Sequence, residues 1–291
     1  MCANCGCQGD KATMLDLQTG ATTTIGAPNA HEHHHADHHH HTHDHDDSHH
    51  HHAGDGHSHS HGHAHGQLVN IVDVEARILA KNDALAAKNR AWCAGREILA
   101  LNLVSSPGAG KTTLLERTIR DLTGELPLYV IEGDQATAND GERIRNAGAA
   151  AVQLNTGTGC HLDAEMVSRA LAALKPALGA AVLIENVGNL VCPALFDLGE
   201  RAKAVIFPVT DGEDKPLKYP HIFRAAGIVL ISKIDLLPHV DFVVADAVAN
   251  IRQVNADAPI LQVSARSGQG LQDWYGWLRA ERAAARQAAF A

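Results

Sequence analysis

Short apolar runs alternate with amphipathic stretches from Ile98 to the end of the chain. The runs are continuous, which is typical of strands buried on both faces of a sheet. The pattern predicts helices between them and an α/β fold, with a mostly parallel central sheet and helices on both faces. The predicted strands are Ile98–Val104, Leu128–Ile131, Ala150–Leu154, Ala181–Ile184, Ala204–Val209, Ile228–Ile231 and Ile260–Val263, and helices include Lys111–Leu122, Ala164–Leu174, Phe242–Val254 and Leu271–Ala289.

The chain before this region divides into four segments. Residues 68–95 carry apolar positions at helical spacing and predict a leading helix, which begins a folded domain over 68–291. Residues 31–66 contain almost nothing apolar except alanine, so we expect a disordered tract. Residues 10–30 predict a polar linker, and residues 1–9 form a short cysteine motif.

Composition narrows the class of protein. The 291 residues carry a net charge of −9 with histidines neutral, and no run of Lys or Arg suggests a nucleic-acid partner. No apolar run approaches the roughly 18 residues that span a membrane, and the chain start has no apolar signal core. We therefore expect a cytoplasmic protein without a membrane partner. In the reducing cytoplasm, clustered cysteines more often bind metal than form disulfides.

A phosphate-binding loop lies at 105–113, Ser-Ser-Pro-Gly-Ala-Gly-Lys-Thr-Thr, between a predicted strand and a predicted helix. Its glycines allow backbone amides to converge on phosphates, although Ser105 stands where the first glycine is usual. This context predicts a P-loop NTPase. The nucleotide-binding candidates here are Gly108, Ala109, Gly110, Lys111, Thr112 and Thr113.

Magnesium and catalysis require groups at neighbouring strand ends. Thr112 would offer its hydroxyl to Mg²⁺, while Asp134 and Glu185 follow predicted strands and are the acidic candidates. Lys111 and Asp134 are the catalytic candidates, and Gly188 could sense a γ-phosphate through its backbone amide. No general base can be identified, so we expect slow hydrolysis.

The base-recognition candidates follow the last two predicted strands. Residues 231–236, Ile-Ser-Lys-Ile-Asp-Leu, resemble the Asn-Lys-x-Asp motif of GTPases, with Ser232 in place of Asn. By that resemblance Asp235 would accept two hydrogen bonds from guanine and Lys233 would cover the base. Ser264 and Ala265 resemble the second base-contacting loop, so the expected nucleotide is GTP.

Two sets of thiols are candidate metal sites. Cys160 and His161 are adjacent, and Cys192 follows the Glu185–Asn189 segment, a ligand set that suits Zn²⁺ or Ni²⁺. The alternative for this set is a capping loop with a buried cysteine, and a complete site would need two copies of the chain. The N-terminal set could bind Ni²⁺, bind Zn²⁺ or serve a redox role; it consists of Cys2, Cys5 and Cys7.

Nineteen of the 22 histidines lie between His31 and His65. Imidazole binds Ni, Co, Cu and Zn well, which indicates a metal reservoir. Asp, Gly, Ser, Thr and Ala interrupt the tract, which argues against an expression tag. A solvated linker without a metal role stays an alternative.

The order of these motifs resembles the hydrogenase nickel-incorporation GTPases, the HypB family. The resemblance rests on the cysteine start, the His-rich tract, the phosphate loop and the runs at 132–137, 159–162, 185–193 and 209–218. It implies a Mg²⁺-dependent GTPase that forms a homodimer and delivers nickel to the [NiFe] hydrogenase large subunit. It also implies a small zinc-binding accessory chaperone as partner, a nickel site at Cys2, Cys5 and Cys7, and a Ni/Zn site at Cys160, His161 and Cys192.

Two other functions stay open at this point. The chain could be a nickel or zinc store with a regulatory GTPase domain, or a related GTPase that serves urease or cobalamin metabolism. The cysteine start and the adjacent Cys160-His161 pair disfavour the urease partner, which typically carries Cys-Pro-His.

Overall fold

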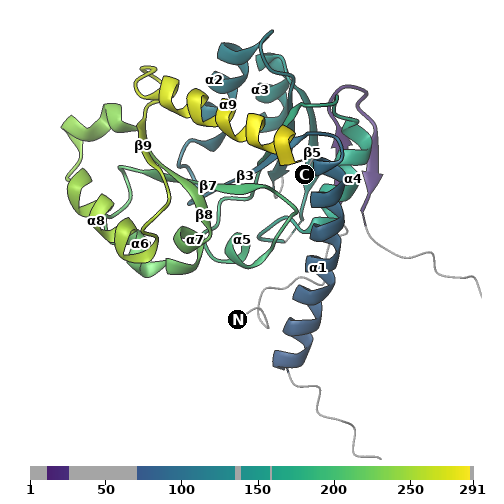
Figure 1. Cartoon of the computed structure of the whole chain (residues 1–291), viewed down its shortest axis with the longest axis horizontal. Helices are drawn as coiled ribbons and strands as arrows, with labels where there is room; N and C mark the ends of the chain where they lie inside the picture. Colours follow the sequence, from purple (N-terminus) through teal and green to yellow (C-terminus); the bar gives the residue numbers. More distant parts are fainter. Residues whose placement is uncertain (1–11, 26–70, 135–138, 158, 289–291) are drawn as a thin grey trace, which may run out of the picture.

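One nine-stranded sheet organises the chain (Figure 1). The computed structural model describes residues 12–25, 71–134, 139–157 and 159–288. In this part the strand order is β2-β1-β5-β4-β6-β3-β7-β8-β9, with β3 to β9 parallel and β1 antiparallel to both neighbours. The strands are β1 (Thr13–Asp16), β2 (Thr22–Thr24), β3 (Leu99–Ser105), β4 (Leu128–Asp134), β5 (Ala150–Asn155), β6 (Ala181–Glu185), β7 (Ala202–Pro208), β8 (Ala226–Ser232) and β9 (Ile260–Val263).

Helices cover both faces of the sheet. Helices α2, α3 and α9 pack on one face, and α1, α4, α7 and α8 pack on the other (Figure 1). The predicted α/β class with a mostly parallel sheet is therefore confirmed. The helices are α1 (Ile71–Ala94), α2 (Lys111–Leu122), α3 (Asn139–Ala147), α4 (Ala164–Leu174), α5 (Cys192–Leu195), α6 (Lys215–Lys218), α7 (Pro220–Arg224), the 3-10 helix η1 (Ile234–His239), α8 (Val244–Val254) and α9 (Leu271–Ala288).

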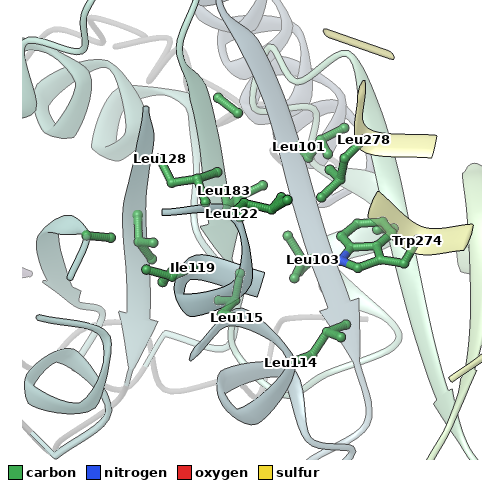
Figure 2. Close-up of a cluster of buried hydrophobic side chains, with 14 of the residues drawn as sticks. Leu101, Leu103, Leu114, Leu115, Ile119, Leu122, Leu128, Leu183, Trp274 and Leu278 are labelled. Carbon is green, nitrogen blue, oxygen red and sulfur yellow. The ribbon is translucent and has the colours of Figure 1, made fainter. Parts of the chain in front are cut away.

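The hydrophobic core between the sheet and helices α2 and α9 supports the two elements that the phosphate loop connects, β3 and α2. Leu101 and Leu103 of β3 are fully buried against α2 and α9, next to Trp274 (Figure 2). Full burial of one such leucine contributes about 1.5–3 kcal/mol to folding. The Trp274 Nε1–H donates to Thr118 Oγ1 at 3.0 Å, so the indole also satisfies its polar atom inside the core. Strand β3 and helix α2 therefore hold the loop between them on a rigid support.

Residues 10–30 correct one expectation. We expected a polar linker, but β1 and β2 form a hairpin whose first strand pairs with β5 along the register Thr13↔Asn155 to Asp16↔Val152. Leu17 and Ile25 are buried beside it, which explains why this polar segment folds. The hairpin covers the edge of β5, and an uncovered strand edge would present unpaired backbone groups.

Several sequence expectations fall outside the described residues. The candidate ligands Cys2, Cys5 and Cys7 and the tract at 31–66 belong to this group. Among the residues that the structure describes, no helix is both long enough and apolar enough to cross a membrane.

Candidate nucleotide and metal site

The phosphate loop joins the end of β3 to the start of α2. Gly108 and Gly110 adopt φ values of 70° and 94°, which are accessible to glycine at little steric cost. The Lys111 Nζ donates to Ser105 Oγ at 2.8 Å, and burial lowers the pKa of this lysine. The serine that replaces the usual glycine thus holds the lysine side chain through its hydroxyl.

A cavity of about 470 Å³ opens above this loop. All six loop candidates of the sequence analysis line it, from Gly108 to Thr113, together with Glu185 and Gly188. The structure adds residues that the sequence analysis did not select. Those with polar or charged side chains are Glu132, Asp140, Arg143 and Asn186.

Thr112 and Glu185 form the best candidate for holding Mg²⁺. The Thr112 hydroxyl donates to Glu185 Oε1 at 2.7 Å, and burial raises the pKa of Glu185 to about 7. Glu185 Oε2 is buried without a hydrogen-bond partner in the described part of the chain. A buried, unsatisfied carboxylate oxygen beside a hydroxyl fits an oxygen-binding cation. Asp134 ends β4 at the same edge of the sheet, but its side chain lies outside the described residues.

Arg143 was missed because its helix has a weak apolar pattern. Helix α3 places the guanidinium at the cavity, where it donates to Glu116 Oε2 at 2.8 Å and to Asp140 Oδ1 at 2.9 Å. It also donates to Thr113 Oγ1 at 3.3 Å. Arg143 therefore links α3 to the first turn of α2 beside the phosphate loop.

Three of the four base-recognition candidates, Lys233, Asp235 and Ala265, line a second cavity of about 240 Å³, next to the first. Asp235 Oδ1 accepts a hydrogen bond from Ser264 Oγ at 2.6 Å. Lys233 has a φ of 60° and donates from Nζ to Gly108 O at 2.7 Å. Ser232, in the place of the usual Asn, donates to Ala109 O at 3.1 Å and so still ties this loop to the phosphate loop. Ser264, the fourth candidate, contributes through Asp235.

The structure brings Cys160, His161 and Cys192 together. One ligand atom from each lies within 4.8 Å of the others. Cys160 Sγ donates to Cys192 Sγ at 2.9 Å and lies 3.6 Å from His161 Nδ1. Burial lowers the pKa of His161, which favours the neutral imidazole that binds metals. Phe196 lies against this ring, with the two ring centroids 3.9 Å apart. Two sulfurs and one imidazole make three donors of a set that suits Ni²⁺ or Zn²⁺.

Residues 185–192 run from the nucleotide cavity to this cluster and are named here the joining loop. A Cβ built on Gly188 would lie 2.9 Å from Pro107 Cα, so the joining loop rests directly on the phosphate loop. At its far end Asn189 Nδ2 donates to Cys160 O at 3.5 Å, and Cys192 supplies its thiol. One short segment therefore touches both candidate sites.

Comparison with known proteins shows to which family the chain belongs. A family model described as "CobW/HypB/UreG, nucleotide-binding domain" matches residues 99–262. The hydrogenase maturation factor HypB of Rhizobium leguminosarum bv. viciae is 56% identical over 218 residues, which cover 75% of this chain and 72% of that protein. The chain belongs to the HypB family.

Other members of the HypB family agree in sequence and fold. The hydrogenase/urease maturation factor HypB of Helicobacter pylori (strain ATCC 700392 / 26695) is 38% identical over 211 residues, covering 71% of this chain and 86% of that protein. The crystal structure of HypB from Helicobacter pylori in complex with nickel superimposes with a TM-score of 0.65 at 36% identity, covering 69% of this chain and 95% of that chain. These matches confirm the predicted family and the P-loop NTPase fold.

Proposed function

We propose that this chain is a GTP-hydrolysing nickel metallochaperone that helps insert nickel into the large subunit of [NiFe] hydrogenase. The observation that carries the proposal is the joining loop, which borders the nucleotide cavity at Glu185 and Gly188 and contributes Cys192 to the metal cluster. A segment that contacts both sites can transmit the nucleotide state to the metal. The family membership supports hydrogenase maturation as the process served.

GTP would be held by the GTPase domain over residues 68–291. Lys111 would approach the β- and γ-phosphates, and Asp235 would accept hydrogen bonds from guanine. Thr112 and Glu185 would hold Mg²⁺, with Asp134 as a further candidate ligand. The bound ion would neutralise charge that develops on the phosphates during hydrolysis. Lys111 and Asp134 stay our catalytic candidates, and the slow rate that we expect suits a timer.

Nickel is the cargo in this proposal. Cys160, His161 and Cys192 would bind Ni²⁺, or Zn²⁺ in another state of the cycle. Three donors from one chain leave room for ligands from a second copy, which supports a homodimer. Cys2, Cys5 and Cys7 would form a second nickel site, and the tract at 31–66 would store nickel.

The other expected partners follow from the family. They are a small zinc-binding hydrogenase accessory chaperone and the precursor of the hydrogenase large subunit. We place this exchange in the cytoplasm, where thiol ligands stay reduced.

The test is nickel binding in the presence of GDP or a non-hydrolysable GTP analogue. It compares a chain lacking residues 31–66 with the same chain carrying Cys160→Ala, so the tract contributes no background. We expect the two nucleotides to give different nickel affinities, and Cys160→Ala to abolish the difference. Equal affinities in both nucleotide states would reject the metallochaperone proposal and favour the store.

Urease maturation is a second candidate because the Helicobacter pylori relative is named as a hydrogenase/urease maturation factor. Deleting the gene in its host and measuring both activities separates the candidates. Loss of hydrogenase activity alone, restored by added nickel, supports the hydrogenase client. Loss of urease activity as well supports a shared role.

A further inference from the structure

Asn186 lies where the joining loop meets the segment that carries Cys160 and His161, residues 159–163, which is named here the metal loop. The Asn186 side chain is almost fully buried, at 1% exposure, and lines the nucleotide cavity. Its Oδ1 accepts two backbone hydrogen bonds, from Val187 N at 3.0 Å and from Leu162 N at 3.2 Å. Val187 belongs to the joining loop and Leu162 directly follows His161. A single amide oxygen therefore binds the backbones of both loops.

The other end of the Asn186 amide is anchored in the core. Its Nδ2 donates to Asn102 Oδ1 at 3.2 Å, and Asn102 Nδ2 donates to Glu200 Oε1 at 3.1 Å. Asn102 lies in the middle of β3 and is fully buried, and Glu200 is paired with Lys203. A buried chain of hydrogen bonds thus holds the Asn186 amide in one orientation.

This chain returns to the metal cluster by a second route. Lys203 Nζ donates to Phe196 O at 3.0 Å, and the Phe196 ring lies against the His161 ring. Glu200 Oε2 accepts from Leu198 N at 2.7 Å, which fixes the same segment. The network therefore supports the backbone beside His161 and also the ring that covers it.

The geometry points to Asn186 as the positioning residue that couples nucleotide state to the metal site. If the joining loop moves with the nucleotide, Asn186 must carry Leu162 along or leave a buried N–H without a partner. An unsatisfied buried group costs about 1–3 kcal/mol, so the two loops move together. This inference rests on the proposed function, because it names the residue through which nickel and GTP would be linked.

The test measures the ratio of nickel affinities with the GTP analogue and with GDP, in the full chain. Thiolate-to-nickel absorption reports binding, and subtraction of the Cys160→Ala signal removes nickel bound elsewhere. The variants are Asn186→Ala, Asn186→Asp and Asn102→Ala. The control is Asn89→Ala: Asn89 is also buried, and it donates to Ala164 O and Leu198 O, without a described hydrogen bond to residues 185–188.

We expect a ratio of about 5- to 150-fold in wild type, the usual range of coupling between two sites. Asn186→Ala should bring the ratio to within 2-fold of unity, and Asn102→Ala should reduce it. Asn186→Asp keeps an oxygen that accepts both N–H groups and should retain a larger ratio than the alanine variant. Asn89→Ala should keep the wild-type ratio even if it lowers the melting temperature.

The outcomes separate the proposed function from the role of Asn186. A wild-type ratio of unity would reject the proposed function and this inference together. A wild-type ratio that survives in Asn186→Ala, or that falls equally in Asn89→Ala, would overturn the role of Asn186 alone. If Asn186→Ala fails to fold, the comparison of the other two variants decides. A larger affinity ratio in Asn186→Asp than in Asn102→Ala supports the inference, and a smaller one contradicts it.

Discussion

Replacing Gly188 by alanine tests the contact between the joining loop and the phosphate loop. Gly188 does not have a positive φ, so an alanine meets no backbone strain, only crowding. The added Cβ would lie 2.9 Å from Pro107 Cα and 3.2 Å from Pro107 N, whereas carbon contacts are favourable at about 3.5–4.0 Å. These are backbone atoms that cannot rotate away. The two loops must therefore separate by about 0.5 Å or more.

The magnitude follows from the cost of such crowding. Overpacking by one methyl group costs about 1–3 kcal/mol, which corresponds to about a 5- to 150-fold loss of affinity. We expect this loss for a non-hydrolysable GTP analogue, because its γ-phosphate would lie where the two loops meet, at the cavity that Gly188 lines. GDP lacks that phosphate, so its affinity should fall less.

Titration of a fluorescent GTP analogue and of fluorescent GDP measures both effects. Gly276→Ala is the matched control, since a Cβ there meets nothing within 4 Å and helix α9 should gain from the change. Wild-type affinity of Gly188→Ala for the GTP analogue would refute the reasoning. So would equal losses for both nucleotides, because they would indicate general damage to the phosphate loop.

Three further predictions concern ionisable groups. Burial raises the pKa of Glu185 from 4.5 to about 7, so between these pH values the folded metal-free chain binds a proton that the unfolded chain has released. The free energy of unfolding should therefore fall as the pH rises from 4.5 to about 7. Glu185→Gln should flatten the fall in melting scans made in EDTA, and parallel curves would contradict this. Burial raises the pKa of the Cys93 thiol to about 11, so iodoacetamide at about pH 8 should label Cys160 but leave Cys93 unlabelled until the chain unfolds. Nickel should protect Cys160 and Cys192 in peptide mass spectrometry, and unchanged labelling with nickel would argue against the metal site. Asp235→Asn should weaken GDP binding about 10- to 100-fold, because the hydrogen bonds to the charged carboxylate are lost, and should improve binding of xanthosine diphosphate. An unchanged affinity for GDP would show that Asp235 does not contact the base.

The sequence predicted the elements whose pattern is long or tied to a motif. Helix α2 begins at Lys111 and ends at Leu122 as expected, because the phosphate loop fixes its start and its apolar positions repeat at helical spacing. The hairpin of β1 and β2 was missed because strands of four and three residues carry little pattern. The hairpin joins the sheet because β1 pairs with β5, which is more than a hundred residues away in sequence.

The candidate site divides in the same way. Lys111 and Asp235 could be selected because local motifs name them. Asn186 could not, because its role depends on hydrogen bonds to Leu162 and Asn102, which lie 24 and 84 residues away in sequence. The sequence signal for such a buried hydrogen-bond network is an isolated polar residue within an apolar run. Asn102, inside the apolar run of β3, carries that signal.

Sheet order explains how one loop can serve two sites. Strand β6 lies between β3 and β4, so the joining loop that follows it is beside the phosphate loop that follows β3. The metal loop follows β5, on the far side of β4, and must cross the end of that strand to reach Asn186. Gly133 provides the space, because a Cβ there would lie 2.9 Å from Leu162 Cδ1. The absence of a side chain at this position of β4 therefore permits the two loops to share one amide, and the coupling that we propose depends on it.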